Sequence, residues 1–165
     1  MPIRIATLAD IPTIRAIAHE TWPAAYFPKI LGAEQLAYML ELLYSETVLE
    51  DVMTKKGQQF VLFIDRGTAL GFAGFTPHHR GTATTHLNKL YVLPEAQGTG
   101  AGKLLLEHVL TEASNRGDTS VELNVNKRNE AVAFYSYMGF RILRDEVIDI
   151  GQGYVMDDHV MVKQL

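Results

Sequence analysis

A glycine-rich run between an apolar segment and an amphipathic one is the feature that most constrains this chain. Residues 97–103 read Gln-Gly-Thr-Gly-Ala-Gly-Lys; they follow an apolar segment, 86–93, and precede leucines and valines at helical spacing. Backbone N–H groups at a helix N-terminus lack partners and carry partial positive charge, and glycines let an anion approach them closely. The run is therefore predicted to hold a diphosphate, or else to be a tight strand-to-helix turn that needs positive φ.

Two familiar phosphate-binding patterns fail on this run. A Walker loop requires glycine where Gln97 stands, and Ser or Thr where Leu104 follows Lys103. The dinucleotide fingerprint that would begin at Gly98 requires glycine at position 103, and it normally follows the first strand of a strand–helix–strand series. The run therefore indicates neither an NTPase nor a nicotinamide-dependent enzyme.

The remaining patterns predict a mixed sheet with helices packed on it. Helical spacing begins after Asp10, which is expected to cap the first helix, and Asn129 is expected to cap the last one. Residues 22–28 are expected to break the first helix into an aromatic loop. Strands are expected at 3–6, 59–64, 69–76, 86–93, 121–125, 141–150 and 154–162, and further helices at 32–43, 47–53, 104–116 and 129–138. A C-terminal strand that exposes Val155 and Val160–Val162 is expected to pair two copies in a homodimer.

Composition places the chain among globular proteins and narrows its partners. Its 165 residues, 47% hydrophobic and 21% charged, fit one domain over 1–165. Fifteen Lys and Arg against nineteen Asp and Glu give a net charge of −4, which disfavours nucleic-acid binding and suits a small cationic substrate. The chain has no cysteine, which excludes a cysteinyl acyl-enzyme, and its histidines lack metal-ligand spacing, so no metal is expected. No membrane-length apolar run or signal peptide is found, so we expect a cytoplasmic protein without a membrane partner.

Two segments resemble signatures of the GNAT N-acetyltransferase family. Gln97, Gly100 and Gly102 form Gln-x-x-Gly-x-Gly after a strand, which is similar to the family's acetyl-coenzyme A signature. Residues 126–140 resemble the family segment that ends in Phe-Tyr-x-x-x-Gly-Phe. The resemblance implies an α/β (α+β) GNAT fold: a single mixed, mostly antiparallel central sheet with flanking helices and a splayed pair of parallel strands that binds acyl-CoA.

The resemblance also implies that acetyl-CoA donates an acetyl group to a primary amine of a small molecule, by direct attack in a ternary complex. A polyamine is favoured because His19–Trp22 and Tyr26 faintly resemble bacterial spermidine/spermine acetyltransferases. Acetylation of a protein or peptide N-terminus or lysine is an alternative, and so is an acyl-CoA sensor without turnover. The residues implied to bind the cofactor are Leu90, Tyr91 and Val92 along the pantetheine arm, Gln97, Gly98, Thr99, Gly100, Ala101, Gly102 and Lys103 at the diphosphate, and Asn129 and Tyr135 nearby.

Two residues are predicted to move protons. Many family members carry a glutamate on the strand before the glycine loop; counting by twos back from Leu90 places Asn88 and His86 on that face. His86, with an ordinary pKa of about 6.5, is the predicted base, directly or through water, or else a strand-end histidine without a role. Tyr135 matches the family tyrosine near the sulfur and is the predicted acid for the leaving thiolate, or else a core aromatic.

The acceptor amine is expected to meet aromatic and acidic side chains. Trp22, Tyr26 and Asn88 are the predicted substrate contacts, and the two aromatic residues are core residues in the alternative interpretation. The negative charge for a cationic acceptor would come from carboxylates that are otherwise solvated, namely Glu20, Glu34, Asp157 or Asp158.

Overall fold

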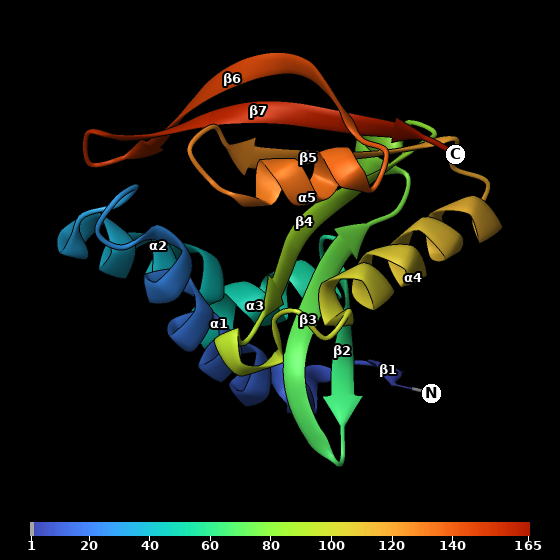
Figure 1. The fold of residues 1–165 in the computed structure, drawn as a ribbon, viewed down its shortest axis with the longest axis horizontal. Helices are drawn as coiled ribbons and strands as arrows, with labels where there is room; N and C mark the ends of the chain where they lie inside the picture. Colours follow the sequence, from blue (N-terminus) through green and yellow to red (C-terminus); the bar gives the residue numbers. More distant parts are fainter. Residues whose placement is uncertain (1) are drawn as a thin grey trace.

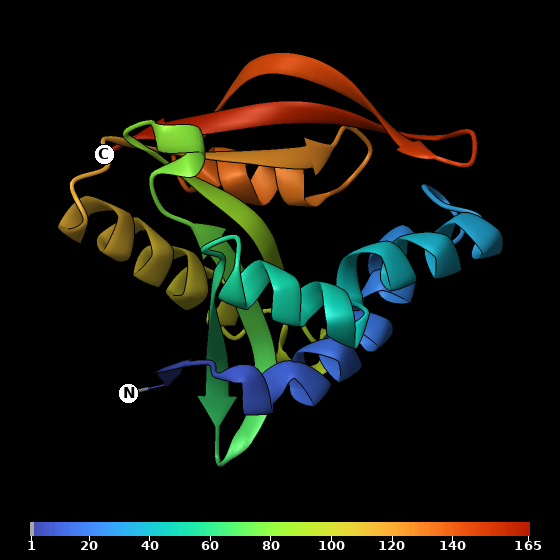
Figure 2. The ribbon, with the colours of Figure 1, turned by 180° about the vertical axis from the view of Figure 1, so that it is seen from behind.

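The computed structural model describes residues 2–165, so Met1 of the predicted 1–165 domain lies outside the described part. Its elements follow the predicted order, and Figures 1 and 2 show helices on both faces of a sheet. They are β1 (Ile3–Ile5), η1 (Leu8–Asp10), α1 (Ile11–Tyr26), α2 (Ala33–Tyr44), α3 (Glu46–Thr54), β2 (Gln59–Asp65), β3 (Thr68–Thr76), η2 (His79–Gly81), β4 (Thr84–Val92), η3 (Pro94–Ala96), α4 (Ala101–Asn115), β5 (Ser120–Asn126), α5 (Ala131–Tyr137), β6 (Arg141–Gly151) and β7 (Tyr154–Gln164). Among these residues, no helix has both the length and the apolar character needed to cross a membrane.

Within residues 2–165, seven strands form one sheet in the order β1-β2-β3-β4-β5-β7-β6. Neighbouring strands are antiparallel except β4 and β5, which run parallel. The predicted mixed, mostly antiparallel sheet with one parallel pair is thus confirmed. The predicted exposed C-terminal strand is wrong at Val160–Val162, because β7 inserts between β5 and β6 and buries these residues; β6 forms the edge. The homodimer stays a prediction.

Alternating side chains of the central strands separate two apolar layers. On β2, Phe60 and Leu62 pack with α1, α2 and α3, whereas Val61 and Phe63 pack with α4 and α5. This is the period-two pattern of a strand covered on both faces. In Figure 1 α4 and α5 lie in front of the sheet, and in Figure 2 the helices of the other layer face the viewer.

The parallel strands β4 and β5 diverge partway along their length. Their pairing runs from Thr84 opposite Ser120 to Leu87 opposite Leu123, while β4 continues to Val92. Figure 1 shows β4 turning down and away from β5 beyond this point. The predicted splayed pair of parallel strands is therefore present, and it leaves one edge of β4 beyond Leu87 without β5 beside it.

The first helix is longer than predicted. The sequence interpretation ends it before an aromatic loop over 22–28, but α1 continues to Tyr26 with Pro23 inside it. Trp22 and Tyr26 are buried four residues apart, with ring centroids 4.7 Å apart. A proline inside a helix costs roughly 3 kcal/mol, and burial of two aromatic side chains on one helix face is large enough to offset it.

Two predicted helix caps turn out differently. The carboxylate of Asp10 accepts the amide of Thr7 at 2.8 Å and pairs with Arg4 at 2.9 Å, so it stabilises the turn η1 and not the first turn of α1. Asn129 does cap α5, because its Oδ1 accepts the amide of Ala131 at 2.9 Å. The sequence identifies both as capping residues, but the 3-10 turn before α1 places the Asp10 carboxylate on the Thr7 amide instead of on an amide of α1.

Candidate active site

The glycine loop connects β4 to α4 through backbone that only glycine adopts easily. Gly98 has φ +80° and Gly100 has φ +87°, and α4 begins at Ala101. A Cβ atom on either glycine would meet no atom of the described chain within 4 Å. The turn therefore needs positive φ, as one interpretation of the sequence expects, and it also leaves open space beside the helix N-terminus, as the other requires.

The first turn of α4 combines unpaired amides with a lysine. The amides of Ala101, Gly102 and Lys103 are among those that the helix itself cannot satisfy. Lys103 carries its ammonium on the same turn, 3.9 Å from Glu107. Gln97, at the start of the loop, donates its side-chain amide to the carbonyl of Val92 at 3.3 Å, which ties the loop to the end of β4. This arrangement suits a phosphate-type anion.

The free edge of β4 presents backbone amides toward the splay. Leu93 donates its amide to Leu70 of β3 at 2.8 Å. Since successive residues of a strand turn their amides to opposite edges, the amides of Val92 and Leu90 point away from β3. This edge can pair with an extended ligand, as one more strand would.

Three hydroxyl and amide groups from separate elements converge beside the splay. The hydroxyl oxygens of Tyr26 on α1 and Tyr91 on β4 lie 2.8 Å apart, and Asn129 before α5 donates its Nδ2 to the Tyr26 hydroxyl at 3.3 Å. Burial raises the pKa of Tyr26, and it raises that of Tyr91 well above its ordinary value. Both phenols therefore stay protonated at neutral pH and act as neutral hydrogen-bonding groups.

Tyr135 on α5 lies in the apolar layer next to this network. Its ring packs at 5.3 Å from Phe134 and 5.8 Å from Phe140, measured between centroids. Burial raises the pKa of Tyr135 well above its ordinary value, with a further contribution from Tyr26. The side chain is thus a core aromatic that is protonated at neutral pH, and its raised pKa makes it a weaker acid than an exposed tyrosine.

A β-bulge changes which residues of β4 share a face. Gly74 of β3 pairs with Lys89, but the next residue, Phe75, pairs with Leu87, so Asn88 is an extra residue in β4. Leu87 packs in the same layer as Leu90, so counting by twos across the bulge gives the wrong face. The prediction that His86 and Asn88 continue the face of Leu90 is therefore wrong. Asn88 accepts a 2.8 Å hydrogen bond from Thr76 at the bulge.

His86 lies in a positively charged environment. Its ring stacks on His79 with centroids 4.7 Å apart, and its Nδ1 is buried without a partner among residues 2–165. Burial, the largest cause, together with charge repulsion from His79, Arg80 and Lys89 lowers the pKa of His86 to about 4. The ring is neutral at pH 7, and the neighbouring cations Arg80 and Lys89 repel an approaching ammonium. His86 is adjacent to Leu87 on β4 and therefore faces the other side of the sheet from the layer that holds Leu87 and Tyr135.

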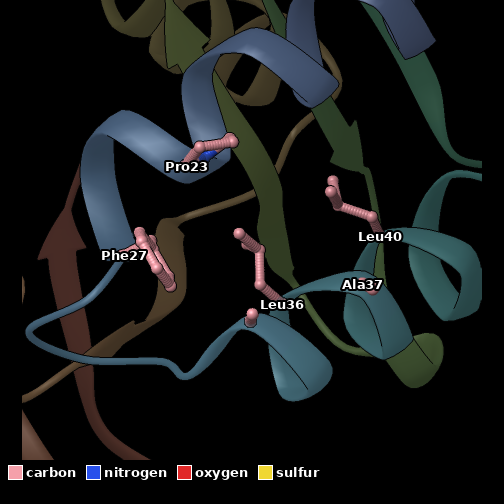
Figure 3. Close-up of a pocket in the computed structure, with 6 residues that line it drawn as sticks. Pro23, Phe27, Leu36, Ala37 and Leu40 are labelled. Atoms are coloured by element: carbon pink, nitrogen blue, oxygen red, sulfur yellow. The ribbon is translucent and has the colours of Figure 1, made fainter.

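Of the predicted aromatic substrate contacts, Trp22 lies in the core and Tyr26 takes part in the hydrogen-bond network beside the splay. Trp22 is 3% exposed and donates its indole N–H to the Tyr44 hydroxyl, so it belongs to the core. Tyr26 is also buried, but its hydroxyl takes part in the network described above. Phe27, just beyond α1, is exposed and faces Leu36 across an apolar hollow of about 260 Å³ between α1 and α2 (Figure 3).

Sequence reasoning did not single out one carboxylate from its neighbours. Of the four acidic candidates, Glu20, Glu34 and Asp157 are exposed, whereas Asp158 is 1% exposed. Asp157 pairs with Lys127 at 3.0 Å. The signal for Asp158 is its spacing, because it stands in phase with the buried residues Val160 and Val162 on one face of β7.

Known proteins share this architecture. The PaiA N-acetyltransferase of Thermoplasma acidophilum, solved in complex with coenzyme A, superposes with a TM-score of 0.81 at 23% identity, over 100% of both chains. The family model described as "Acetyltransferase (GNAT) domain" matches residues 31–155. The fold is thus the predicted GNAT fold.

Two known proteins are also similar to this chain in amino-acid sequence. An uncharacterised N-acetyltransferase of Mycobacterium tuberculosis strain H37Rv is 30% identical over 160 residues, which are 96% of this chain and 99% of that protein. The peptidyl-lysine N-acetyltransferase YjaB of Salmonella typhimurium is 34% identical over 120 residues, 72% of each chain. The chain therefore belongs to the GNAT family of acetyl-CoA-dependent N-acetyltransferases.

Proposed function

We propose that this enzyme acetylates a primary amine at the end of an alkyl chain, such as a lysine side chain, by direct transfer from acetyl-CoA. One observation carries the proposal: an open β4 edge, a glycine-rich helix N-terminus and a tyrosine–asparagine network all adjoin the splay between β4 and β5. The chain has no cysteine to accept the acetyl group, which favours attack by the amine itself.

The donor is proposed to lie along the free edge of β4. Amides in 97–103 would bind its diphosphate, with Lys103 adding a charge, and Leu90, Tyr91 and Val92 would pair with the pantetheine arm. The Val92 amide, which points to the splay, would then polarise the thioester carbonyl. Asn129 follows β5, and Tyr135 lies on α5. Tyr135 would donate a proton to the leaving thiolate.

The acceptor class follows from relatives and charge together. A relative that aligns over 72% of this chain is a peptidyl-lysine N-acetyltransferase, and its amine is a lysine-like alkylammonium. The net charge of −4 favours a cationic acceptor. A polyamine carries the same terminal group, but the segment that suggested it includes Trp22, which packs in the core and whose indole N–H is already bonded to the Tyr44 hydroxyl.

A thiol-release assay tests the proposal. Purified enzyme is incubated with acetyl-CoA and, separately, a blocked lysine peptide, a peptide with a free α-amino group, and spermidine. We expect release of coenzyme A and a mass increase of one acetyl group with the lysine peptide, with linear initial rates and no acetylated enzyme. Acetyl-CoA binding without acetylation of any amine would instead support an acyl-CoA sensor.

A further inference from the structure

Asp158 on β7 is a buried carboxylate with an oxygen left free. It is 1% exposed, and its Oδ1 has no hydrogen-bond partner within residues 2–165. The other oxygen, Oδ2, accepts a long hydrogen bond of 3.4 Å from the Asn124 amide. An ionised carboxylate in such a place costs several kcal/mol unless a charged or hydrogen-bonding partner compensates it.

The fold places this carboxylate on the face of the sheet that carries Tyr26. Asp158 lies opposite Asn126 of β5 and Glu146 of β6, and residues directly opposite in antiparallel strands share a face. Met156, two residues earlier on β7, packs in the layer formed with α1, α2 and α3. Asp158 interacts electrostatically with Tyr26 of that layer, whose hydroxyl meets Tyr91 and Asn129.

The charges around Asp158 favour a cation. Burial raises its pKa, Glu146 on β6 and the adjacent Asp157 raise it further, and Asn124 and His159 oppose the shift. Tyr26 on α1, whose pKa the charge of Asp158 helps to raise, is a neutral phenol. Arg144 lies 3.7 Å from Glu146 and 3.2 Å from Glu122, and Lys127 lies 3.0 Å from Asp157, so these two neighbouring cations already have carboxylate partners other than Asp158.

We propose that Asp158 binds the ammonium of the acceptor and accepts its proton, taking the role that the sequence suggests for His86. The inference rests on the proposed function. His86 stands near Arg80 and Lys89, which repel an ammonium, whereas Asp158 lies near the carboxylates of Glu146 and Asp157 and keeps an unpaired oxygen of its own. The buried, unpaired Oδ1 is the feature that an ammonium of this class would satisfy.

The reaction balances with the groups present. The ammonium R–NH3⁺ gives one proton to the carboxylate of Asp158, and the neutral amine attacks the thioester carbonyl carbon. The C–N bond forms and the C–S bond breaks; the nitrogen loses a second proton to solvent, and the thiolate takes a proton from Tyr135. Asp158 then releases its proton to solvent, and solvent reprotonates Tyr135. The net products are the acetamide, coenzyme A thiol and one proton.

Asp158→Asn tests the assignment, because it removes the charge and keeps the shape. We expect kcat/KM with the blocked lysine peptide to fall at least about 100-fold and its acidic pH limb to disappear, while the affinity for acetyl-CoA stays within about twofold. The midpoint of thermal unfolding at pH 8 should rise, because a buried unpaired charge is gone. Asp65→Asn removes an exposed carboxylate at the end of β2, away from the proposed site; it is the matched control and should change kcat/KM by less than about threefold.

Other outcomes would refute either the role of Asp158 or the proposed function, and the measurements distinguish the two. Activity within about threefold of wild type, or loss of activity together with loss of stability, refutes the role of Asp158. Loss of the acidic limb in His86→Ala but not in Asp158→Asn assigns the base to His86. If the wild type acetylates no amine, the proposed function fails. The Asp158 site is then decided by saturation-transfer NMR with coenzyme A present: it requires the blocked lysine to bind wild type and not Asp158→Asn.

Discussion

Gly100 and Gly117 offer a matched pair of substitutions at the two ends of α4. Both have φ +87°, and a Cβ on either would meet no atom of the described chain within 4 Å. Alanine at such a φ costs about 1 kcal/mol in each case, because only the backbone conformation is strained. For a chain of this size that cost lowers the thermal midpoint by about 2–4 °C. Gly100→Ala and Gly117→Ala should therefore be destabilised equally.

The two variants should differ in affinity for coenzyme A. Gly100 directly precedes the first-turn amides that are proposed to bind the diphosphate, so relief of strain there moves those amides. We expect Gly100→Ala to bind coenzyme A at least about tenfold more weakly, a loss of about 1.4 kcal/mol. Gly117, at the far end of the helix, should leave the affinity unchanged.

Titration calorimetry with coenzyme A, beside thermal unfolding of both variants, measures the two quantities separately. Equal stabilities with unequal affinities support a diphosphate site at residues 97–103. The reasoning is refuted if Gly100→Ala keeps wild-type affinity, or if Gly117→Ala loses as much affinity, since backbone strain alone would then account for the effect.

Two further predictions concern buried titratable groups. Burial lowers the pKa of Lys89 from 10.5 to about 8, so its ammonium costs the folded state about 3 kcal/mol below pH 8, and this cost vanishes above pH 10.5. The unfolding free energy of wild type relative to Lys89→Met, measured with urea, should therefore rise by about 2–3 kcal/mol from pH 7 to 10.5; a constant difference would contradict this. Tyr135→Phe should lower kcat about tenfold with coenzyme A affinity unchanged, because a thiolate leaves fairly well unaided; unaltered turnover with an unshifted alkaline limb would exclude a proton-donor role.

Local patterns predicted most of the fold because the forces that form its elements act over short stretches. Helical spacing in α4 indicates a helix with one apolar face, and the continuous apolar run in β2 indicates a strand buried on both faces. Gly98 and Gly100 indicate a turn with positive φ. The parallel β4–β5 pair came from the family resemblance and not from a local pattern. The extension of α1 through Pro23 was not predictable from propensity, because packing of Trp22 and Tyr26 outweighs it.

The site was less predictable because it depends on register. Nothing in the sequence marks Asn88 as an extra residue, yet the bulge there reverses the face on which every earlier residue of β4 lies. Likewise, Asp157 and Asp158 are adjacent acidic residues, and only the pairing of β7 with β5 and β6 shows which of them is buried.

Residue type alone does not decide whether His86 or Asp158 is the base; the charges around each residue do. By ordinary pKa, a histidine is a better base near pH 7 than an aspartate, so His86 is the natural choice from the sequence. Its cationic neighbours and its burial bring its pKa to about 4, while burial and carboxylates raise that of Asp158. The two groups thus approach one another in basicity, and the remaining difference is that one environment repels an ammonium and the other attracts it. For a cationic acceptor, that electrostatic preference outweighs the intrinsic advantage of imidazole.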